Sequence, residues 1–134
     1  MIKQFAGLLA VLLISGCAGS YHNINKHGES ALGGGFRDTN IADGLYFIIS
    51  KTNFAPWTNF DAAQKTFDRR AKELCAGDYT VIDIKRDQFE HVQTQGAAKY
   101  IISRIEGHVH CKSSGLTLEE AKQQLDLTEP SSPD

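Results

Sequence analysis

The chain has 134 residues, with 14 lysines and arginines against 16 aspartates and glutamates, and its formal net charge is −2 at pH 7. This length suits one domain with a single hydrophobic core. The slight negative charge excludes broad electrostatic attraction to a phosphate backbone, so we expect no nucleic-acid partner.

The start of the chain has the composition of an export signal. A basic start with Lys3 precedes an apolar run over residues 5–14, and two small residues then lead directly to Cys17. The apolar run is well short of the roughly 20 residues that a transmembrane helix needs. We therefore expect residues 1–16 to be a cleaved signal peptide rather than a retained span.

The end of this signal resembles the lipobox of bacterial lipoproteins, in which an aliphatic residue and two small residues precede a cysteine. Here these residues are Ile14, Ser15, Gly16 and Cys17. In that family the cysteine thiol receives a diacylglyceryl group, the preceding peptide bond is cut, and the new amino terminus is usually acylated. The resemblance implies a membrane anchor on Cys17; the alternative is an ordinary signal with a cysteine nearby by chance.

The residue after the implied anchor bears on the compartment. In Gram-negative lipoproteins an aspartate at this position favours retention at the inner membrane, whereas this chain has Ala18. The resemblance therefore implies a bacterial envelope protein, lipid-anchored at the outer membrane and facing the periplasm.

Residues 17–35 are rich in glycine, serine, asparagine and histidine and end in three glycines. Such a composition predicts a flexible tether between lipid and domain. We expect one α+β domain over residues 36–112, a short C-terminal helix over 113–127 and a disordered tail over 128–134.

The domain is predicted to open with a β-hairpin. Residues 36–41 and 45–50 flank Asp43 and Gly44, a dipeptide that is typical of tight hairpin turns. The loop that follows carries two aromatic residues, Phe54 and Trp57. An exposed tryptophan can anchor a partner, and the same residue ahead of a helix can instead pack against it, so we keep both residues as candidates for partner binding.

The next segment carries an apolar stripe at helical spacing, which predicts a helix that covers the sheet. Thr58 is the expected N-cap, with Asp61 at the third helical position, and Gly77 is the expected left-handed residue at the C-terminus. The stripe consists of Phe60, Ala63, Phe67, Ala71 and Leu74.

Two more strands are predicted over residues 79–84 and 99–111, which completes a four-stranded, mainly antiparallel sheet with one main helix on one face. With Cys17 lipidated, an exported chain keeps two further cysteines, Cys75 and Cys111. In an oxidising compartment such a pair predicts one disulfide, between the end of the helix and the last strand. Thr117 and Glu120 match a capping box and predict the start of the C-terminal helix.

His108 and His110 project from one face of the last predicted strand, beside Glu106. Two imidazoles can hold a transition metal when a third ligand approaches from elsewhere, but a solvated strand face explains them as well. We keep both as candidate ligands and expect no cofactor. The chain contains no nucleophile elbow, phosphate-binding glycine loop or HExxH sequence, so we expect no enzyme.

Four short segments carry a second resemblance: Gly35-Phe36 and residues 67–75, 77–82 and 105–111. Together they resemble small bacterial outer-membrane lipoproteins of uncharacterised function. In layout the chain is also similar to envelope stress-sensing lipoproteins, which carry a tethered, disulfide-linked α+β domain, although it lacks their proline-rich tether. The resemblance implies a non-catalytic protein that binds another envelope component. The alternative is a small metal- or ligand-binding protein that uses the His108/His110 face.

Overall fold

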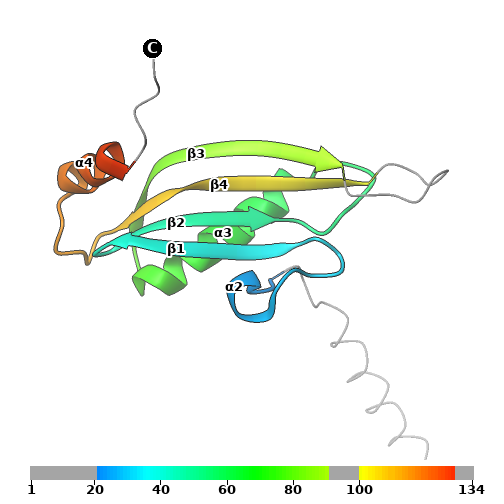
Figure 1. Cartoon of the computed structure of the whole chain (residues 1–134), viewed down its shortest axis with the longest axis horizontal. Helices are drawn as coiled ribbons and strands as arrows, with labels where there is room; N and C mark the ends of the chain where they lie inside the picture. Colours follow the sequence, from blue (N-terminus) through cyan, green and yellow to red (C-terminus); the bar gives the residue numbers. More distant parts are fainter. Residues whose placement is uncertain (1–20, 91–99, 129–134) are drawn as a thin grey trace, which may run out of the picture.

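The computed structural model describes residues 21–90 and 100–128. The strands in these ranges form one antiparallel sheet of four strands in the order β1-β2-β4-β3, with one long helix across one face (Figure 1). The predicted α+β fold is confirmed. The elements in chain order are α2 (Ile24–His27), β1 (Gly35–Ala42), β2 (Leu45–Lys51), α3 (Phe60–Cys75), β3 (Tyr79–Glu90), β4 (Ile101–Cys111) and α4 (Leu118–Thr128).

Several predictions fall outside the described residues, among them the signal peptide, the lipidation of Cys17 and the tail beyond residue 128. The predicted hairpin is confirmed as β1 and β2, with Ala42 opposite Leu45 across the turn. The third strand is longer than predicted, because residues 85–90 continue β3 as far as the partner of Ile101 on β4.

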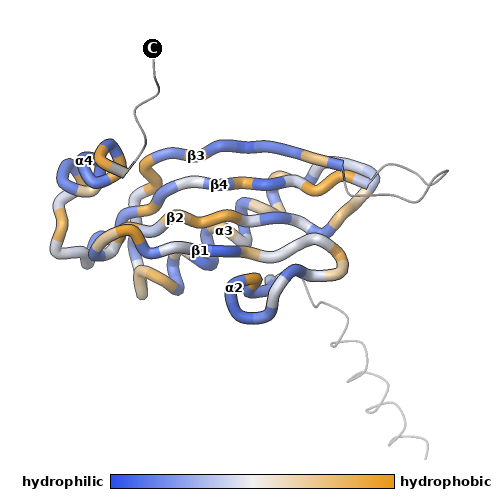
Figure 2. The backbone as a smooth tube through the Cα atoms, viewed as in Figure 1, coloured by the Kyte–Doolittle hydropathy of each residue, from blue (hydrophilic) through white to orange (hydrophobic). Residues whose placement is uncertain are grey.

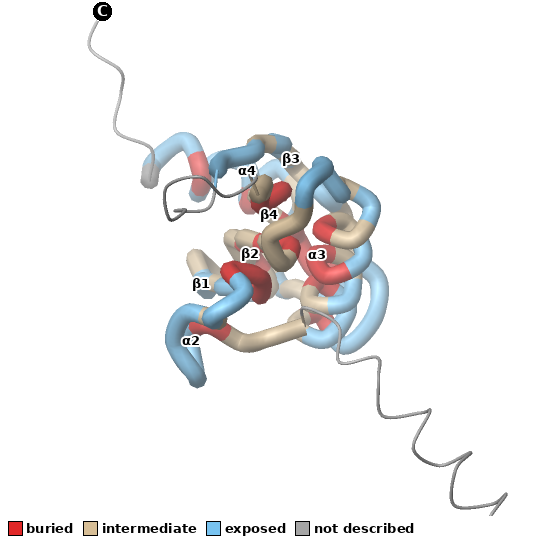
Figure 3. Tube along the Cα trace, turned by 90° about the vertical axis from the view of Figure 1, so that its right-hand side faces the viewer, coloured by how far each residue is buried: buried red, intermediate tan, exposed pale blue. Residues whose placement is uncertain are grey.

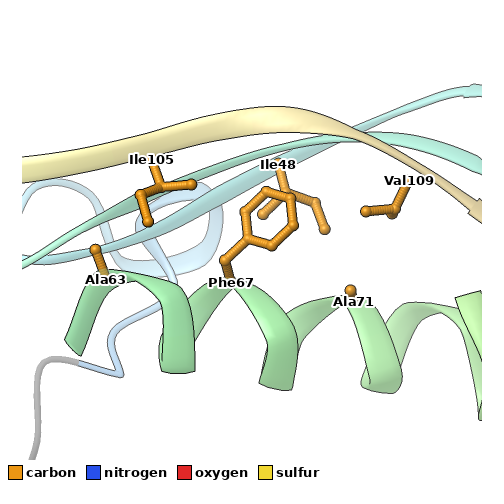
Figure 4. Packing of buried hydrophobic residues seen from close by; sticks show 6 residues of the cluster. All are labelled: Ile48, Ala63, Phe67, Ala71, Ile105 and Val109. Atoms are coloured by element: carbon orange, nitrogen blue, oxygen red, sulfur yellow. The ribbon is translucent and has the colours of Figure 1, made fainter. Parts of the chain in front are cut away.

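The main core lies between α3 and the sheet. Phe67 points from the middle of α3 to Ile48 on β2, and the small side chains of Ala63 and Ala71 on either side let the helix lie close to the sheet (Figure 4). Apolar residues form a nearly continuous run in β2, whereas β3 is largely hydrophilic (Figure 2). The fully buried residues of this core are Ile48, Ala63, Phe67, Ala71, Ile105 and Val109.

Both ends of α3 differ by one residue from the prediction. The N-cap is Asn59 rather than Thr58: its side chain accepts a hydrogen bond from the Ala62 N–H at 3.1 Å. Its own N–H donates to Ser103 Oγ on β4 at 2.8 Å, which fixes the start of the helix on the sheet. At the other end the left-handed residue is Ala76, with φ of 51°, rather than Gly77.

The predicted disulfide is confirmed. Cys75 and Cys111 are bonded, with their Cα atoms 5.1 Å apart, and both residues are buried. The bridge joins the last turn of α3 to the end of β4, so it holds the main helix against one of the central strands.

The segment ahead of β1 is not the flexible tether that its composition predicts. From Tyr21 onward the chain packs against the domain: Ile24 is buried, and the Phe36 N–H donates to the carbonyl of His22 at 2.8 Å. Gly35 allows this close approach, because a Cβ there would lie 2.6 Å from the His22 carbonyl oxygen. The prediction of flexibility over residues 17–35 is therefore wrong from residue 21.

Asn25 closes part of the outer edge of β1. Its side-chain amide donates to the carbonyl of Asp38 at 3.2 Å, and its side-chain oxygen accepts from the Asp38 N–H at 3.2 Å. One side chain thus takes the place of a neighbouring strand at this position.

Tyr21 fastens the start of this segment to α3. Its ring lies 4.5 Å from the ring of Phe36, its hydroxyl donates to Glu73, and the guanidinium of Arg69 lies 3.6 Å from its ring centre. Burial, together with the hydrogen bond to Glu73, raises the pKa of Tyr21 to about 12. Arg70 forms a two-bond ion pair with Asp38 on β1, at 2.7 and 3.2 Å, next to this cluster.

The predicted capping box is confirmed at the start of α4. The Thr117 N–H donates to Glu120 Oε2 at 2.7 Å, and the Glu120 N–H donates to Thr117 Oγ1 at 3.2 Å. Ala121 and Leu125 then pack on Leu45, on the sheet face opposite α3. Viewed along the sheet, α3 and α4 lie on opposite sides of it (Figure 3).

Replacing both bridged cysteines, Cys75→Ser/Cys111→Ser, is expected to lower the free energy of unfolding by about 4 kcal/mol. The bridge spans a sequence separation of 36 residues, and its loss restores the corresponding entropy to the unfolded chain. Urea unfolding measures the change. Cys17→Ser is the control and is expected to unfold at the same urea midpoint as the wild type. An unchanged urea midpoint in the double variant would contradict the expectation.

Candidate binding surface

The sheet face opposite α3 is called here the open face. Alternation along the strands places Phe47 of β2 and His108 of β4 on this face, and the strand register sets them side by side. The face contains a solvent-open hollow of about 530 Å³, a volume within the usual range of small-molecule sites. The hollow is lined by Thr39, Ile41, Phe47, Asp83, Ile84, Lys85, Glu106, Gly107 and His108.

The floor of the hollow is apolar and aromatic. Phe47 and Ile41 are half-buried, and the Phe47 ring lies 4.9 Å from the ring of His108. α4 covers the neighbouring Leu45, so the accessible apolar surface of the hollow stops at this helix on one side. The remaining floor offers flat apolar area of the kind that partner molecules cover.

The rim of the hollow consists of two polar pairs across β3 and β4, one between a carboxylate and an imidazole and one between an ammonium group and a carboxylate. Asp83 places both carboxylate oxygens 2.9 Å from Nδ1 of His108, and one of them also accepts the His108 backbone N–H at 2.9 Å. Lys85 Nζ lies 3.8 Å from the carboxylate of Glu106. The rim therefore presents both signs of charge, held in fixed places by the strand register.

A second ion pair extends this pattern beyond the hollow. Arg104 donates to Asp87 and lowers the pKa of that carboxyl, chiefly through this hydrogen bond. The Nε of Arg104 is buried without a hydrogen-bond partner, and the carboxylate of Glu106 lies 3.8 Å away from it. Arg104 thus links the Asp87 pair to the Lys85 pair along one face of the sheet.

A β-bulge on β3 creates the contact between Asp83 and His108. The register shifts between Val81 and Asp83, so Ile82 is the extra residue and the strand resumes its alternation one position later. Gly107 permits the close approach of the strands here, because a side chain at that position would collide with the carbonyl of Asp83. Strand alternation predicts that His108 lies on the open face. It cannot predict a register shift in the neighbouring strand, so Asp83 was not identified from the sequence as the partner of His108.

The two candidate metal ligands have separate surroundings. His110 is buried, and its Nε2 lies 2.9 Å from the carbonyl oxygen of Leu116, which requires the ring to donate a proton there. His108 is instead held by Asp83 on the open face. Within residues 21–90 and 100–128, no group of three or more histidine, cysteine, aspartate or glutamate side chains is placed to hold a metal ion.

The two aromatic candidates of the loop before α3 also differ. The Phe54 ring lies 5.1 Å from the ring of Tyr100, and its backbone N–H donates to the carbonyl of Leu32 at 2.9 Å. Trp57 is 64% exposed. Phe54 therefore belongs to the packing of the loop, and Trp57 is the residue that this loop presents to its surroundings.

Comparison of the chain with protein-family models, with curated proteins and with solved structures finds no match. Among the helices of the described residues, none has the length and apolar character needed to cross a membrane. The open face and the Trp57 loop are thus identified by geometry.

His110→Ala is expected to lower the free energy of unfolding by about 2 kcal/mol, because it opens a cavity and leaves the Leu116 carbonyl without its donor. His108→Ala is expected to cost about 1 kcal/mol or less, since Asp83 is solvent-exposed and such pairs contribute little. Urea unfolding of the two variants measures the difference, and equal losses would contradict it.

The same substitutions test for metal binding. Zn²⁺ and Cu²⁺ are titrated into the wild type and into His108→Ala/His110→Ala. The separate surroundings of the two rings predict the same metal uptake by both proteins. A stoichiometric site that is lost in the double variant would instead support a metal-binding protein.

Proposed function

We propose that this protein is a non-catalytic bacterial envelope lipoprotein, anchored through Cys17, that binds another envelope component with its open face. The observation that supports binding most strongly is the hollow beside Phe47, which combines an apolar floor with a rim of paired charges. Apolar area favours association, and fixed charges of both signs select the partner and its orientation.

The proposed anchor rests on the lipobox-like sequence that ends at Cys17. The disulfide supports it, because Cys75 and Cys111 bond to each other and leave Cys17 as the remaining cysteine of the chain. Disulfides persist in oxidising compartments such as the periplasm. Two or three acyl chains, at about 0.8 kcal/mol for each buried methylene, hold a domain of this size stably on a membrane.

The proposal of a binding role without catalysis rests on how the polar groups of the hollow are used. Asp83 lies within hydrogen-bond distance of His108, and Lys85 faces Glu106, so each of these groups has its partner on the neighbouring strand. The clearest pKa shifts belong to tyrosines outside the hollow, Tyr21 and Tyr79, each raised to about 12 mainly by burial. Perturbed acids and bases are a frequent mark of catalytic sites, and these two belong to the packing of α3.

A second candidate function is the binding of a small molecule in the same hollow. It is favoured by the volume of about 530 Å³ and by the aromatic floor at Phe47. Both candidate functions use the same hollow, and they differ in the size of the molecule that would bind there.

The anchor is tested by the mass of the protein purified from cell membranes. We expect a chain that begins at Cys17 and carries a diacylglyceryl thioether, and we expect Cys17→Ser to leave the membrane fraction. Peptide mass spectrometry locates the modification. An exported chain with an unmodified Cys17, recovered free of membranes, would refute the anchor.

The binding surface is tested by photocrosslinking in intact cells. A photoreactive residue at Thr39 or Lys85 lies on the open face, whereas one at Lys72 lies on the outer, exposed side of α3. We expect a defined product from the two open-face positions and none from Lys72, with Cys17→Ser as the unanchored control.

Equal capture from Lys72 would contradict the assignment of the open face. Absence of any product, together with a small molecule that copurifies with the wild type and is lost in Phe47→Ala, would favour the second candidate.

A further inference from the structure

Exposed apolar side chains gather at one end of the sheet, where β1 and β4 begin and β2 and β3 end. We call it the anchor end, and it lies on the right in Figure 1. Among the described residues, three of the five exposed large apolar side chains lie there: Leu32 at 50%, Trp57 at 64% and Phe89 at 39%. The other two, Val81 and Leu127, lie toward the opposite end, near the start of β3 and on α4.

The two loops that carry Leu32 and Trp57 are fastened to each other and to the sheet. The Leu32 carbonyl accepts the Phe54 N–H at 2.9 Å. Ala55 then pairs with Ile101 at the start of β4 through two backbone hydrogen bonds, of 2.7 and 3.0 Å. The exposed side chains are therefore presented by a rigid platform, which keeps the entropic cost of binding low.

The chain also leaves the domain at this end. Tyr21 packs on Phe36 in the first part of β1, and Phe36 lies opposite Ser50 near the end of β2, just ahead of the Trp57 loop. Four peptide links connect Tyr21 to Cys17, and they span about 14 Å at most. A lipid on Cys17 would therefore hold Tyr21 within about 14 Å of the bilayer surface, and the first part of β1, on which Tyr21 packs, lies toward the anchor end.

We propose that the anchor end docks on the bilayer, with the side chains of Trp57 and Leu32 in its interfacial layer. This inference rests on the proposed lipidation of Cys17. A tryptophan ring favours the membrane interface, where its apolar body is buried and its N–H remains hydrated. The lipid makes the contact intramolecular, so two side chains too weak to recruit the domain alone suffice to orient it.

Trp57 is the only tryptophan of the chain, so its fluorescence reports this contact directly. The lipidated protein purified from membranes is reconstituted into phosphatidylcholine vesicles. A second sample, the chain from Cys17 onward, is coupled through the Cys17 thiol to a maleimide lipid in the same vesicles; the Cys75–Cys111 disulfide keeps the other sulfurs out of the reaction. We expect a blue shift of the emission, quenching by lipids brominated on their acyl chains, and protection from acrylamide.

Two controls make the result specific. Cys17→Ser mixed with vesicles is expected to keep its emission maximum and its full quenching by acrylamide. Trp57→Phe/Leu127→Trp moves the single tryptophan to α4, at the opposite end. When this variant is anchored, we expect its tryptophan fluorescence to be quenched by acrylamide and not by brominated lipid.

The inference is overturned if Trp57 in the maleimide-coupled sample stays as accessible to acrylamide as in water, or if the Leu127 position is quenched by brominated lipid as strongly as Trp57. The coupled sample does not depend on lipidation in cells. Failure of the proposed anchor therefore shows in the mass of the cellular protein, and failure of the docking shows in the coupled sample.

Discussion

The packing of one helix against one face of the sheet determines the rest of this structure. The Phe67 ring fills the space between α3 and Ile48, and the Cys75–Cys111 bridge holds the end of the helix on β4. Apolar area buried in this way is the main favourable term in folding a domain of this size. Because the main core uses one face and α4 covers the other at Leu45, Phe47 and its neighbours remain accessible beside α4.

Local signals predicted much of this fold. The apolar stripe of α3, the Asp43-Gly44 turn and the capping box at Thr117 each depend on residues close together in sequence, and each is present in the structure. The packed segment before β1 was missed because its order comes from distant contacts. Ile24 is one of few apolar residues in a polar segment, and it is buried where α2 contacts β1.

On the open face too, local sequence signals were predictive and distant contacts were not. Strand alternation places His108 and His110 on one side of β4, and the sequence suggests equal roles for them. Their roles differ because a different segment reaches each of them: the Leu116 carbonyl, ahead of α4, accepts a hydrogen bond from His110, whereas the bulge at Ile82 brings Asp83 to His108. Neither the path of a connecting segment nor a register shift leaves a periodic trace in sequence, so neither was predictable.

The amide of Asn25, bonded to both backbone groups of Asp38, has a consequence for proteins crowded on a surface. Under the proposed lipid anchor, copies held on one membrane would meet often and in similar orientations, conditions that favour the growth of a continuous sheet from chain to chain. On the β1 border the backbone groups of Asp38 and the N–H of Phe36 are already taken, so a neighbouring strand cannot pair at these positions. A sheet that grows from chain to chain needs both borders of every copy, so the contacts at Asp38 and Phe36 work against such growth.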